Sequence, residues 1–116
     1  MLEFVLPHPP SVNHYWQMAG RRMVIGREGR AFRERVCSVL AATGVQPLQG
    51  QLAVRVEVYP PDRRRRDLDN TLKALLDALQ HGGAYADDSQ IAKLAVERRA
   101  PTPGGKVIVR IEEVSR

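Results

Sequence analysis

A run of basic residues meets two acidic residues near the middle of the chain. The order is four consecutive arginines, two aspartates in alternate positions and a lysine: Arg63, Arg64, Arg65, Arg66, Asp67, Asp69 and Lys73. Guanidinium groups attract phosphate, whereas carboxylates repel phosphate unless a divalent cation lies between them. Carboxylate oxygens are the ligands that hard cations such as Mg²⁺ prefer. The pattern therefore favours phosphodiester hydrolysis assisted by a metal ion.

An apolar stripe at helical spacing follows the arginines. It consists of Leu68, Leu72, Leu75, Leu76 and Leu79. This periodicity predicts a helix that begins near Asp67 to Asp69, runs to about His81 and ends at Gly82-Gly83. On such a helix Asp69 and Lys73 are four residues apart and share a face, so the carboxylate and the ammonium can reach the same point.

A second acidic pair, Asp87 and Asp88, follows the predicted helix. A helix from Asp69 to His81 is about 20 Å long. An extended return segment after Gly83 can span roughly that distance, so the two acidic pairs can converge. Aspartate is also common in a turn before a strand, and this alternative leaves the role of Asp87 and Asp88 open.

Each residue of the first acidic group also has a structural interpretation. Asp67 can cap the helix, which is worth about 1 kcal/mol, and Lys73 can pair with Asp69 or Asp77 on the helix surface. Capping does not explain why Asp69 follows two residues later, so metal ligation by Asp67 and Asp69 is the favoured interpretation. Lys73 would then stabilise charge on the pentavalent phosphorus or the leaving oxygen.

The remaining patterns predict strands, a hairpin and one further helix. Strands are expected at 2–6, 52–59, 91–98 and 106–113, a hairpin with its tip at 20–22 and second arm at 23–25, and an amphipathic helix between Gly29 and Thr43. Turn residues at 101–105 suggest that the last two strands form a hairpin. This order predicts an α+β fold with a mixed sheet packed by two helices.

The loop after the first strand carries polar and aromatic residues. Ser11, Asn13, Tyr15 and Trp16 could contact a nucleic-acid backbone or stack on an unpaired base. The alternative is a capped turn whose aromatic rings fill the edge of the core. The sequence leaves both interpretations open.

Composition narrows the class of protein. The chain has 116 residues, 18 Lys and Arg, 13 Asp and Glu and a formal net charge of +5, which indicates one domain over 1–116 and an anionic partner. Cys37 is the single cysteine, so an internal disulfide and a cysteine-rich zinc site are excluded. No apolar run reaches the length of a membrane span, and the first residues lack a secretory signal, so we expect a cytoplasmic protein that does not bind membranes.

Several motifs together resemble one family. The segment Pro60 to Asn70 reads PPDRRRRDLDN and is followed by Lys73, a Gly-Gly helix end and Asp87-Asp88, while Leu6 to Asn13 reads LPHPPSVN. These motifs are similar to those of the RusA-type Holliday junction resolvases of bacteria and their prophages. The resemblance covers nearly the whole chain.

The resemblance implies a fold, an activity and a set of site residues. It implies a RusA-like domain, a homodimer, and an Mg²⁺-dependent endodeoxyribonuclease that resolves four-way junctions by symmetrical paired incisions in DNA recombination and repair, with Mn²⁺ as a substitute metal. The implied catalytic residues are Asp67, Asp69, Lys73 and Asp88. The implied metal ligands are Asp67, Asp69, Asp88 and Asp87. The residues expected to contact DNA are Arg63, Arg64, Arg65, Arg66, Asn13 and Ser11.

Two other functions also fit these residues. One is a non-catalytic nucleic-acid-binding module, in which the arginines bind phosphate and the aspartates only cap and balance charge. The other is a nuclease of the same fold that acts on flaps or other branched DNA. Divalent-dependent cleavage of a synthetic junction separates the first from a resolvase, and relative rates on junction, fork and duplex separate the second.

Overall fold

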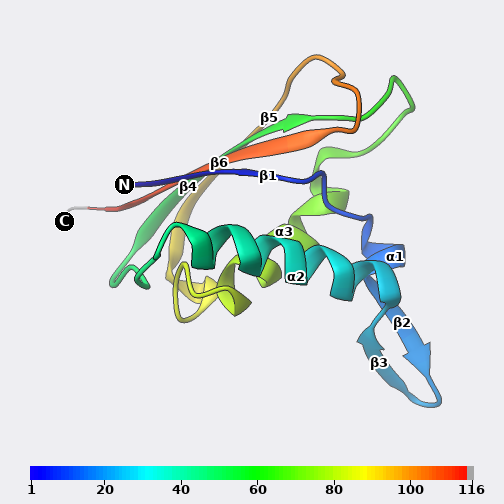
Figure 1. The fold of residues 1–116 in the computed structure, drawn as a ribbon, viewed down its shortest axis with the longest axis horizontal. Coiled ribbons are helices and arrows are strands. Elements are labelled where there is room, and N and C mark those ends of the chain that lie inside the picture. Colours follow the sequence, from blue (N-terminus) through cyan, green and yellow to red (C-terminus); the bar gives the residue numbers. More distant parts are fainter. Residues whose placement is uncertain (115–116) are drawn as a thin grey trace.

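A four-stranded mixed sheet covered on one face by two helices forms the body of the structure, a computed structural model that describes residues 1–114 (Figure 1). The strand order is β1 (Leu2–Leu6), β6 (Lys106–Glu113), β4 (Leu52–Tyr59) and β5 (Ile91–Arg98). The covering helices are α2 (Arg27–Ala42) and α3 (Leu72–His81). The predicted α+β class, with a mixed sheet packed by two helices, is confirmed.

Smaller elements complete the chain. A short helix, α1 (Val12–Tyr15), leads into the hairpin of β2 (Trp16–Ala19) and β3 (Arg22–Ile25), which projects from the body (Figure 1). Two 3₁₀ turns, η1 (Leu68–Thr71) and η2 (Asp88–Gln90), flank α3. Within residues 1–114 no helix has the length and apolarity needed to cross a membrane.

The core lies between the sheet and the two helices. Alternate residues of β4 are buried against the helices, as are Val107, Val109 and Ile111 of β6. Phe32, Val36 and Leu40 of α2 meet them at the spacing expected of a buried helix face. Leu75 and Leu79 of α3 belong to the same cluster, so the leucine stripe in the sequence does mark the face that packs.

The other face of the sheet carries paired charges instead of helices. Glu57 of β4 accepts hydrogen bonds from Arg99, at 2.9 Å, and from Arg110, which also pairs with Glu3. Hydrogen bonds from Arg110 and Arg99 lower the pKa of Glu57. This face is therefore polar, and Glu3, Glu57, Arg99 and Arg110 form ion pairs on it.

The predicted hairpin between the last two strands is wrong. β5 pairs with β4 in parallel, with Val56 opposite Val96, and β6 pairs with β4 and β1 in antiparallel fashion, so β4 lies between β5 and β6. The turn residues cross the end of β4, where Arg99 N donates to Val58 O and Thr102 N to Pro60 O. β4 and β6 are the two inner strands of the sheet, so both edges of the largely buried β4 have partners.

Two boundaries also differ from prediction. The helix expected to begin near Asp67 starts as the 3₁₀ turn η1 and becomes α-helical only at Leu72. The loop after β1 contains the short helix α1, and the hairpin tip is Gly20-Arg21, with Arg22 already in β3. Gly20 has φ +66°, a left-handed conformation that glycine adopts at no steric cost.

Truncation of Leu79 to alanine should lower the free energy of unfolding by about 2–5 kcal/mol, because its side chain is fully buried between helix and sheet. Met18→Ala, on the projecting hairpin and 60% exposed, should change it by less than about 0.5 kcal/mol. Urea unfolding followed by circular dichroism measures both. Equal effects of the two substitutions would contradict the core described here.

Candidate active site

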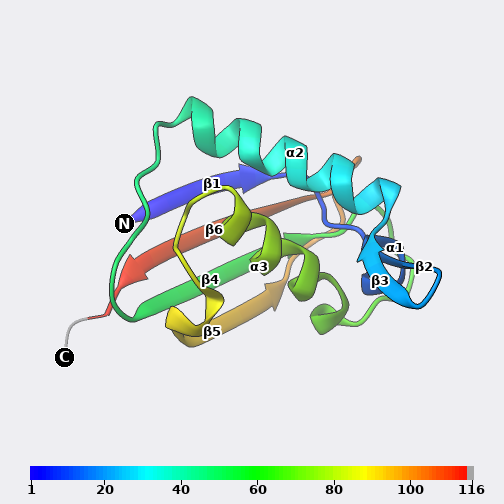
Figure 2. The same ribbon diagram turned by 90° about the horizontal axis from the view of Figure 1, so that it is seen from below.

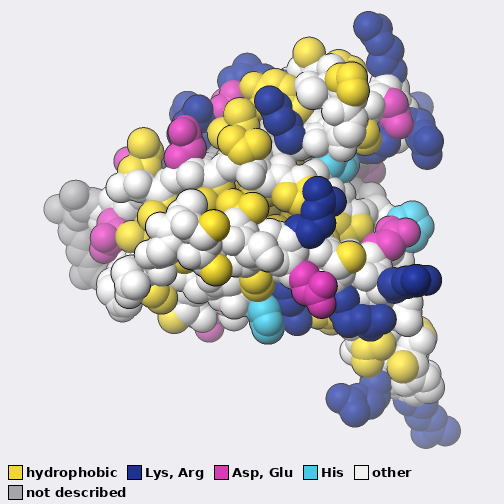
Figure 3. Space-filling view, in the orientation of Figure 1, with side chains coloured by type: hydrophobic (Ala, Val, Ile, Leu, Met, Phe, Trp, Pro, Cys, Tyr) yellow, Lys and Arg dark blue, Asp and Glu magenta, His cyan; other side chains and the backbone are white. Residues whose placement is uncertain are grey.

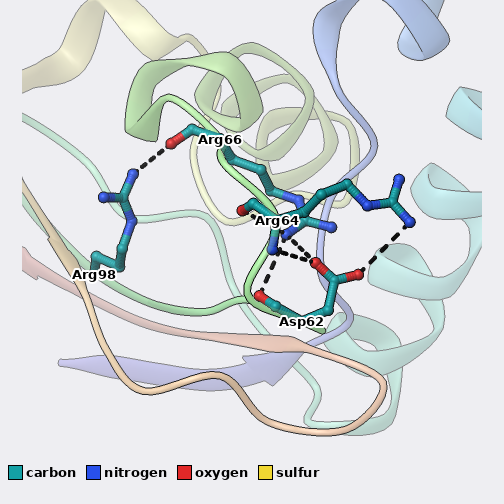
Figure 4. A network of polar contacts seen from close by, with 4 residues as sticks. All are labelled: Asp62, Arg64, Arg66 and Arg98. Atoms are coloured by element: carbon teal, nitrogen blue, oxygen red, sulfur yellow. Dashed lines mark hydrogen bonds and ion pairs between the residues drawn. The ribbon is translucent and has the colours of Figure 1, made fainter.

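The loop after β4 is ordered by a single carboxylate. Pro60 ends the strand, and Asp62 Oδ1 then accepts hydrogen bonds from Arg64 N at 2.9 Å and from Arg66 Nη1 at 2.7 Å (Figure 4). The bond from Arg66, with that from Arg64, lowers the pKa of Asp62 to about 2. Asp62 and Arg66 therefore hold the loop in shape, and the guanidinium of Arg66 is engaged within the loop.

The other three arginines of the run are exposed. Arg64 keeps 81% of its side chain exposed and lies 3.9 Å from Asp62, a weak ion pair. Arg63 and Arg65 have no side-chain hydrogen bond or ion pair to the residues that the structure describes. Three guanidinium groups are thus free to bind phosphate, while the fourth predicted DNA contact, Arg66, has a structural role as well.

Asp67, Asp69 and Lys73 lie together where the loop enters the helix. Asp67 occupies the N-cap position of η1, but its side chain makes no capping hydrogen bond. Asp69 lies in η1 and Lys73 in the first turn of α3, and all three side chains are exposed. Within residues 1–114 none of the three has a side-chain hydrogen bond or ion pair. Capping, the structural alternative for Asp67, is therefore absent.

The structural alternative for Lys73 is also absent, because Asp77 has other partners. Arg33 Nη2 lies 2.6 Å from Asp77 Oδ2, and the Tyr15 hydroxyl donates to the same carboxylate. Burial and this bond raise the pKa of Tyr15 to about 12. Asp77 thus joins α3 to α2 and α1, and Lys73 stays free beside Asp69.

The second acidic pair divides into one structural and one free residue. Asp87 caps η2: its carboxylate accepts from Ser89 N at 2.8 Å, and the Gln90 side chain accepts from Asp87 N at 3.0 Å. Hydrogen bonding from Ser89 lowers the pKa of Asp87. Asp88 donates through its backbone N to Gln80 Oε1, and its carboxylate is exposed. Of the two, Asp88 is the freer metal ligand.

The two acidic pairs lie at opposite ends of α3. Asp67 and Asp69 precede its first turn, whereas Asp88 bonds to Gln80 near its last turn. Among residues 1–114 no three His, Cys, Asp or Glu side chains are grouped closely enough to hold a metal ion. Asp67 and Asp69 are suitable hard oxygen donors, but within one chain they supply only part of the six ligands that Mg²⁺ takes.

The loop that carries the other predicted DNA contacts is partly structural. Ser11 Oγ lies 3.1 Å from His14 Nδ1, and its carbonyl accepts from Tyr15 N, so Ser11 helps to form α1. Tyr15 is fully buried, and Trp16 packs edge-on against it, which supports the core-filling interpretation of these aromatics. Asn13 is exposed and remains a predicted DNA contact.

Two residues next to this site were not predicted. Arg98, at the end of β5, donates to the carbonyl of Arg66 (Figure 4), and with His8, Arg66 and Asp67 it lines a small cavity. Burial, with a contribution from Arg66, lowers the pKa of His8. Only the parallel pairing of β4 with β5 brings Arg98 here, and no local pattern in the sequence reveals that pairing.

Removal of the Arg66 guanidinium, as Arg66→Gln, should raise the pKa of Asp62 from about 2 toward its ordinary value of 3.8. A carboxyl group whose pKa is depressed by folding stabilises the folded loop above its unfolded pKa, and this stabilisation is lost as the pH falls through the folded pKa. The loop contact in the native chain should therefore persist at pH 4 and disappear near pH 2. A ¹³C NMR titration of the Asp62 carboxyl group measures the midpoint, and an unchanged midpoint in Arg66→Gln would exclude this contact.

Basic side chains gather on one side of the molecule. Figure 3 shows many Lys and Arg side chains at the end where the hairpin and the loop after β4 lie in Figure 1. Arg21 and Arg22, at the hairpin tip, are exposed, like Arg63, Arg64 and Arg65 of the loop. The acidic residues Asp67 and Asp69 thus lie in a basic surrounding that favours a polyanion.

Comparison with known proteins identifies relatives along almost the full chain. A family model described as endodeoxyribonuclease RusA matches residues 7–112. A crossover junction endodeoxyribonuclease of Enterobacteria phage HK97 is 39% identical over 113 residues, which cover 97% of this chain and 94% of that protein. Proteins of the same name from Enterobacteria phage 82 and Escherichia coli K12 are 38% and 37% identical over 110 residues, covering 94% of this chain and 92% of each relative.

Proposed function

This chain belongs to the RusA family of endodeoxyribonucleases, and from that premise we propose that it is a crossover junction endodeoxyribonuclease that resolves Holliday junctions. Relatives with this name match it over more than nine-tenths of its length. The substrate is a four-way DNA junction, and the reaction is hydrolysis of one phosphodiester in each of two opposed strands.

One observation in the structure supports this proposal most strongly. Asp67, Asp69 and Lys73 are exposed side chains without intramolecular partners in the described chain, and only Arg66 separates Asp67 from three free guanidinium groups in the sequence. Unpaired charges of both signs in one place contribute little to folding. Their arrangement suits a bound phosphodiester with a cation between carboxylate and phosphate.

Each residue has a defined part in the proposed chemistry. Asp67, Asp69 and Asp88 would hold the Mg²⁺, or Mn²⁺ in its place, with Asp87 supporting Asp88. When bound, such a cation lowers the pKa of water and neutralises charge on the phosphate. Lys73 would stabilise the negative charge that develops on phosphorus and the leaving oxygen. Arg63, Arg64 and Arg65 would hold the DNA backbone at the site.

Paired incision requires two active sites in one protein assembly. We propose a homodimer, since a two-fold symmetric protein presents its two sites to a four-way junction in equivalent positions. Each dimer would then cut two opposed strands. Ser11 and Asn13, which lie near the hairpin, would add contacts to the arms of the junction.

Relative cleavage rates on synthetic four-way junction, replication fork, flap and linear duplex test this proposal. With Mg²⁺ present, we expect the junction to be cut at least about tenfold faster than the others, with paired cuts in opposed strands. Faster cleavage of the flap or fork would assign the protein to the branched-DNA nucleases of the same fold. Binding of every substrate without cleavage would assign it a non-catalytic role.

A further inference from the structure

The hairpin of β2 and β3 projects from the body of the protein and carries two exposed apolar side chains. Met18 lies directly opposite Met23, and the two residues are 60% and 58% exposed. Each strand has four residues, so the hairpin is roughly 13 Å long. Single exposed apolar residues are common on proteins, whereas exposed apolar residues that adjoin each other point to a binding surface. We call Met18 and Met23 the methionine pair.

The base of the hairpin is anchored to the helices. Gly26 N donates to Tyr15 O at 2.8 Å, and Arg30 Nη1 donates to Ile25 O at 2.9 Å. Gly29 of α2 lies so close to this base that a Cβ on it would approach Tyr15 O to 2.6 Å. The hairpin therefore leaves the body in a defined direction and presents its tip at a defined place.

One face of the hairpin is apolar from its base to its tip. Residues two apart on a strand share a face, so the methionine pair lies on the same face as Trp16 and Ile25. Trp16 and Ile25 are partly buried and pack against the core. The apolar face thus continues from the core to the methionine pair, where protein no longer covers it.

The tip of the hairpin is basic. Arg21 lies in the turn and Arg22 begins β3, and both are exposed. The segment from Trp16 to Ile25 contains no acidic residue. Figures 1 and 2 show the hairpin at the same end of the molecule as the turn that leads into α3. Exposed cations beside an apolar pair suit a polyanion that also offers apolar surface, and DNA with an accessible base pair has both properties.

We propose that the hairpin contacts the point of strand exchange in a four-way junction, where the methionine pair packs on an accessible base pair. Arg21 and Arg22 then bind the phosphates beside it. The inference rests on the junction substrate of the proposed function and assigns the preference for that substrate to named residues. Methionine is one of the apolar side chains that proteins insert between base pairs, and arginine is a common partner of the phosphate backbone.

A junction accepts this contact more readily than a continuous duplex does. Insertion into a duplex breaks the stack between two neighbouring base pairs. At the point of strand exchange, the last base pair of an arm becomes accessible when the arms move apart, and unstacking costs least where the stack is already disrupted. The methionine pair should therefore favour junctions over duplex, while the arginines act on charge alone.

Replacement of both methionines, as Met18→Ala/Met23→Ala, tests the apolar contact. Affinity for a four-way junction in EDTA should fall by at least about tenfold, because the apolar surface buried against the base pair is lost. Affinity for a linear duplex should stay unchanged, since the pair does not enter a continuous stack. The salt dependence of junction binding should also stay unchanged, because no charge is removed. Fluorescence anisotropy over a salt series measures these quantities.

Two control variants separate the apolar contact from charge and from a general loss of exposed apolar surface. Arg21→Gln/Arg22→Gln should make the salt dependence of junction binding shallower by about 0.9 for each phosphate that is no longer neutralised. Val5→Ala removes part of a side chain that is 57% exposed on β1, and it should leave junction binding unchanged. A methionine variant that binds junctions as the native protein does would overturn the proposal. A changed sedimentation coefficient of that variant would then assign the methionine pair to contact between copies of the chain.

A junction with 2-aminopurine at the point of strand exchange reports the contact without cleavage. The fluorescence of this base rises when it is unstacked, so native protein bound in EDTA should raise it and the methionine variant, at saturating concentration, should raise it less. An equal rise with both proteins would overturn the contact, and native cleavage in Mg²⁺ would then leave the proposed function standing. Native protein that raises the fluorescence but does not cut in Mg²⁺ would overturn the proposed activity and leave the hairpin contact standing.

Discussion

Asp69→Asn is expected to abolish junction cleavage while leaving junction binding close to that of the native protein. The substitution keeps the size of the side chain but removes the charge that would hold the cation. Loss of one group that stabilises charge in a transition state typically costs about 10²–10³ in rate, and a metal ligand should cost at least that much. Because Asp69 is exposed and has no partner in the described chain, folding should be unaffected.

Cleavage and binding must be measured on the same preparation to interpret this variant. Cleavage is measured as the rate of cutting of a labelled four-way junction in Mg²⁺. Binding to the same junction is measured by gel shift in EDTA. Glu34→Gln removes an exposed carboxylate from α2 and should leave both unchanged. Equal loss of binding and cleavage in Asp69→Asn would mean that Asp69 supports the DNA contact and not the metal.

Replacement of Arg63, Arg64 and Arg65 together by glutamine should weaken junction binding by at least about 10²-fold at physiological salt, since contacts to phosphate dominate such affinities. The three side chains are exposed on a loop whose shape depends on Asp62 and Arg66, so the loop should survive the change. The logarithm of the association constant decreases with the logarithm of the salt concentration, and this dependence should become shallower by about 0.9 for each phosphate that the variant no longer neutralises. Fluorescence anisotropy over a salt series measures both quantities.

The same charge can be removed elsewhere as a control. Arg27, Arg35 and Arg55 are exposed arginines on α2 and β4, outside the loop. Their joint replacement by glutamine changes the net charge equally, but it should affect the salt slope less than the loop variant does. Equal effects of the two triple variants would show that overall charge, and not the loop after β4, governs DNA binding.

Local patterns in the sequence predicted the elements better than their arrangement. The alternation in β4 and the leucine spacing of α3 identify both a strand and a helix, because burial on one face imposes those periods. The parallel pairing of β5 with β4 was missed, since a short connection rich in glycine and proline is equally typical of a hairpin. The order of strands in a sheet depends on how the whole core packs, and a local pattern in the sequence does not report it.

The candidate site shows a similar limit. The juxtaposition of Arg63 to Arg66 with Asp67 and Asp69 is local and visible in the sequence. The structure adds the distinctions that local reasoning could not make: Arg66 orders the loop, Asp87 caps η2, and Asp77 binds Tyr15 and Arg33. Each depends on a contact between segments far apart in the chain or on the geometry of one turn.

Addition of Mg²⁺ to a preformed complex tests the proposed function most directly. Native protein is bound to a four-way junction in EDTA, excess Mg²⁺ is added, and both pairs of opposed strands are followed on a denaturing gel. We expect no cleavage before the metal and then cuts at symmetrical positions in two opposed strands. Cleavage in EDTA, or an intact junction after Mg²⁺ although the protein is bound, would contradict a metal-dependent resolvase.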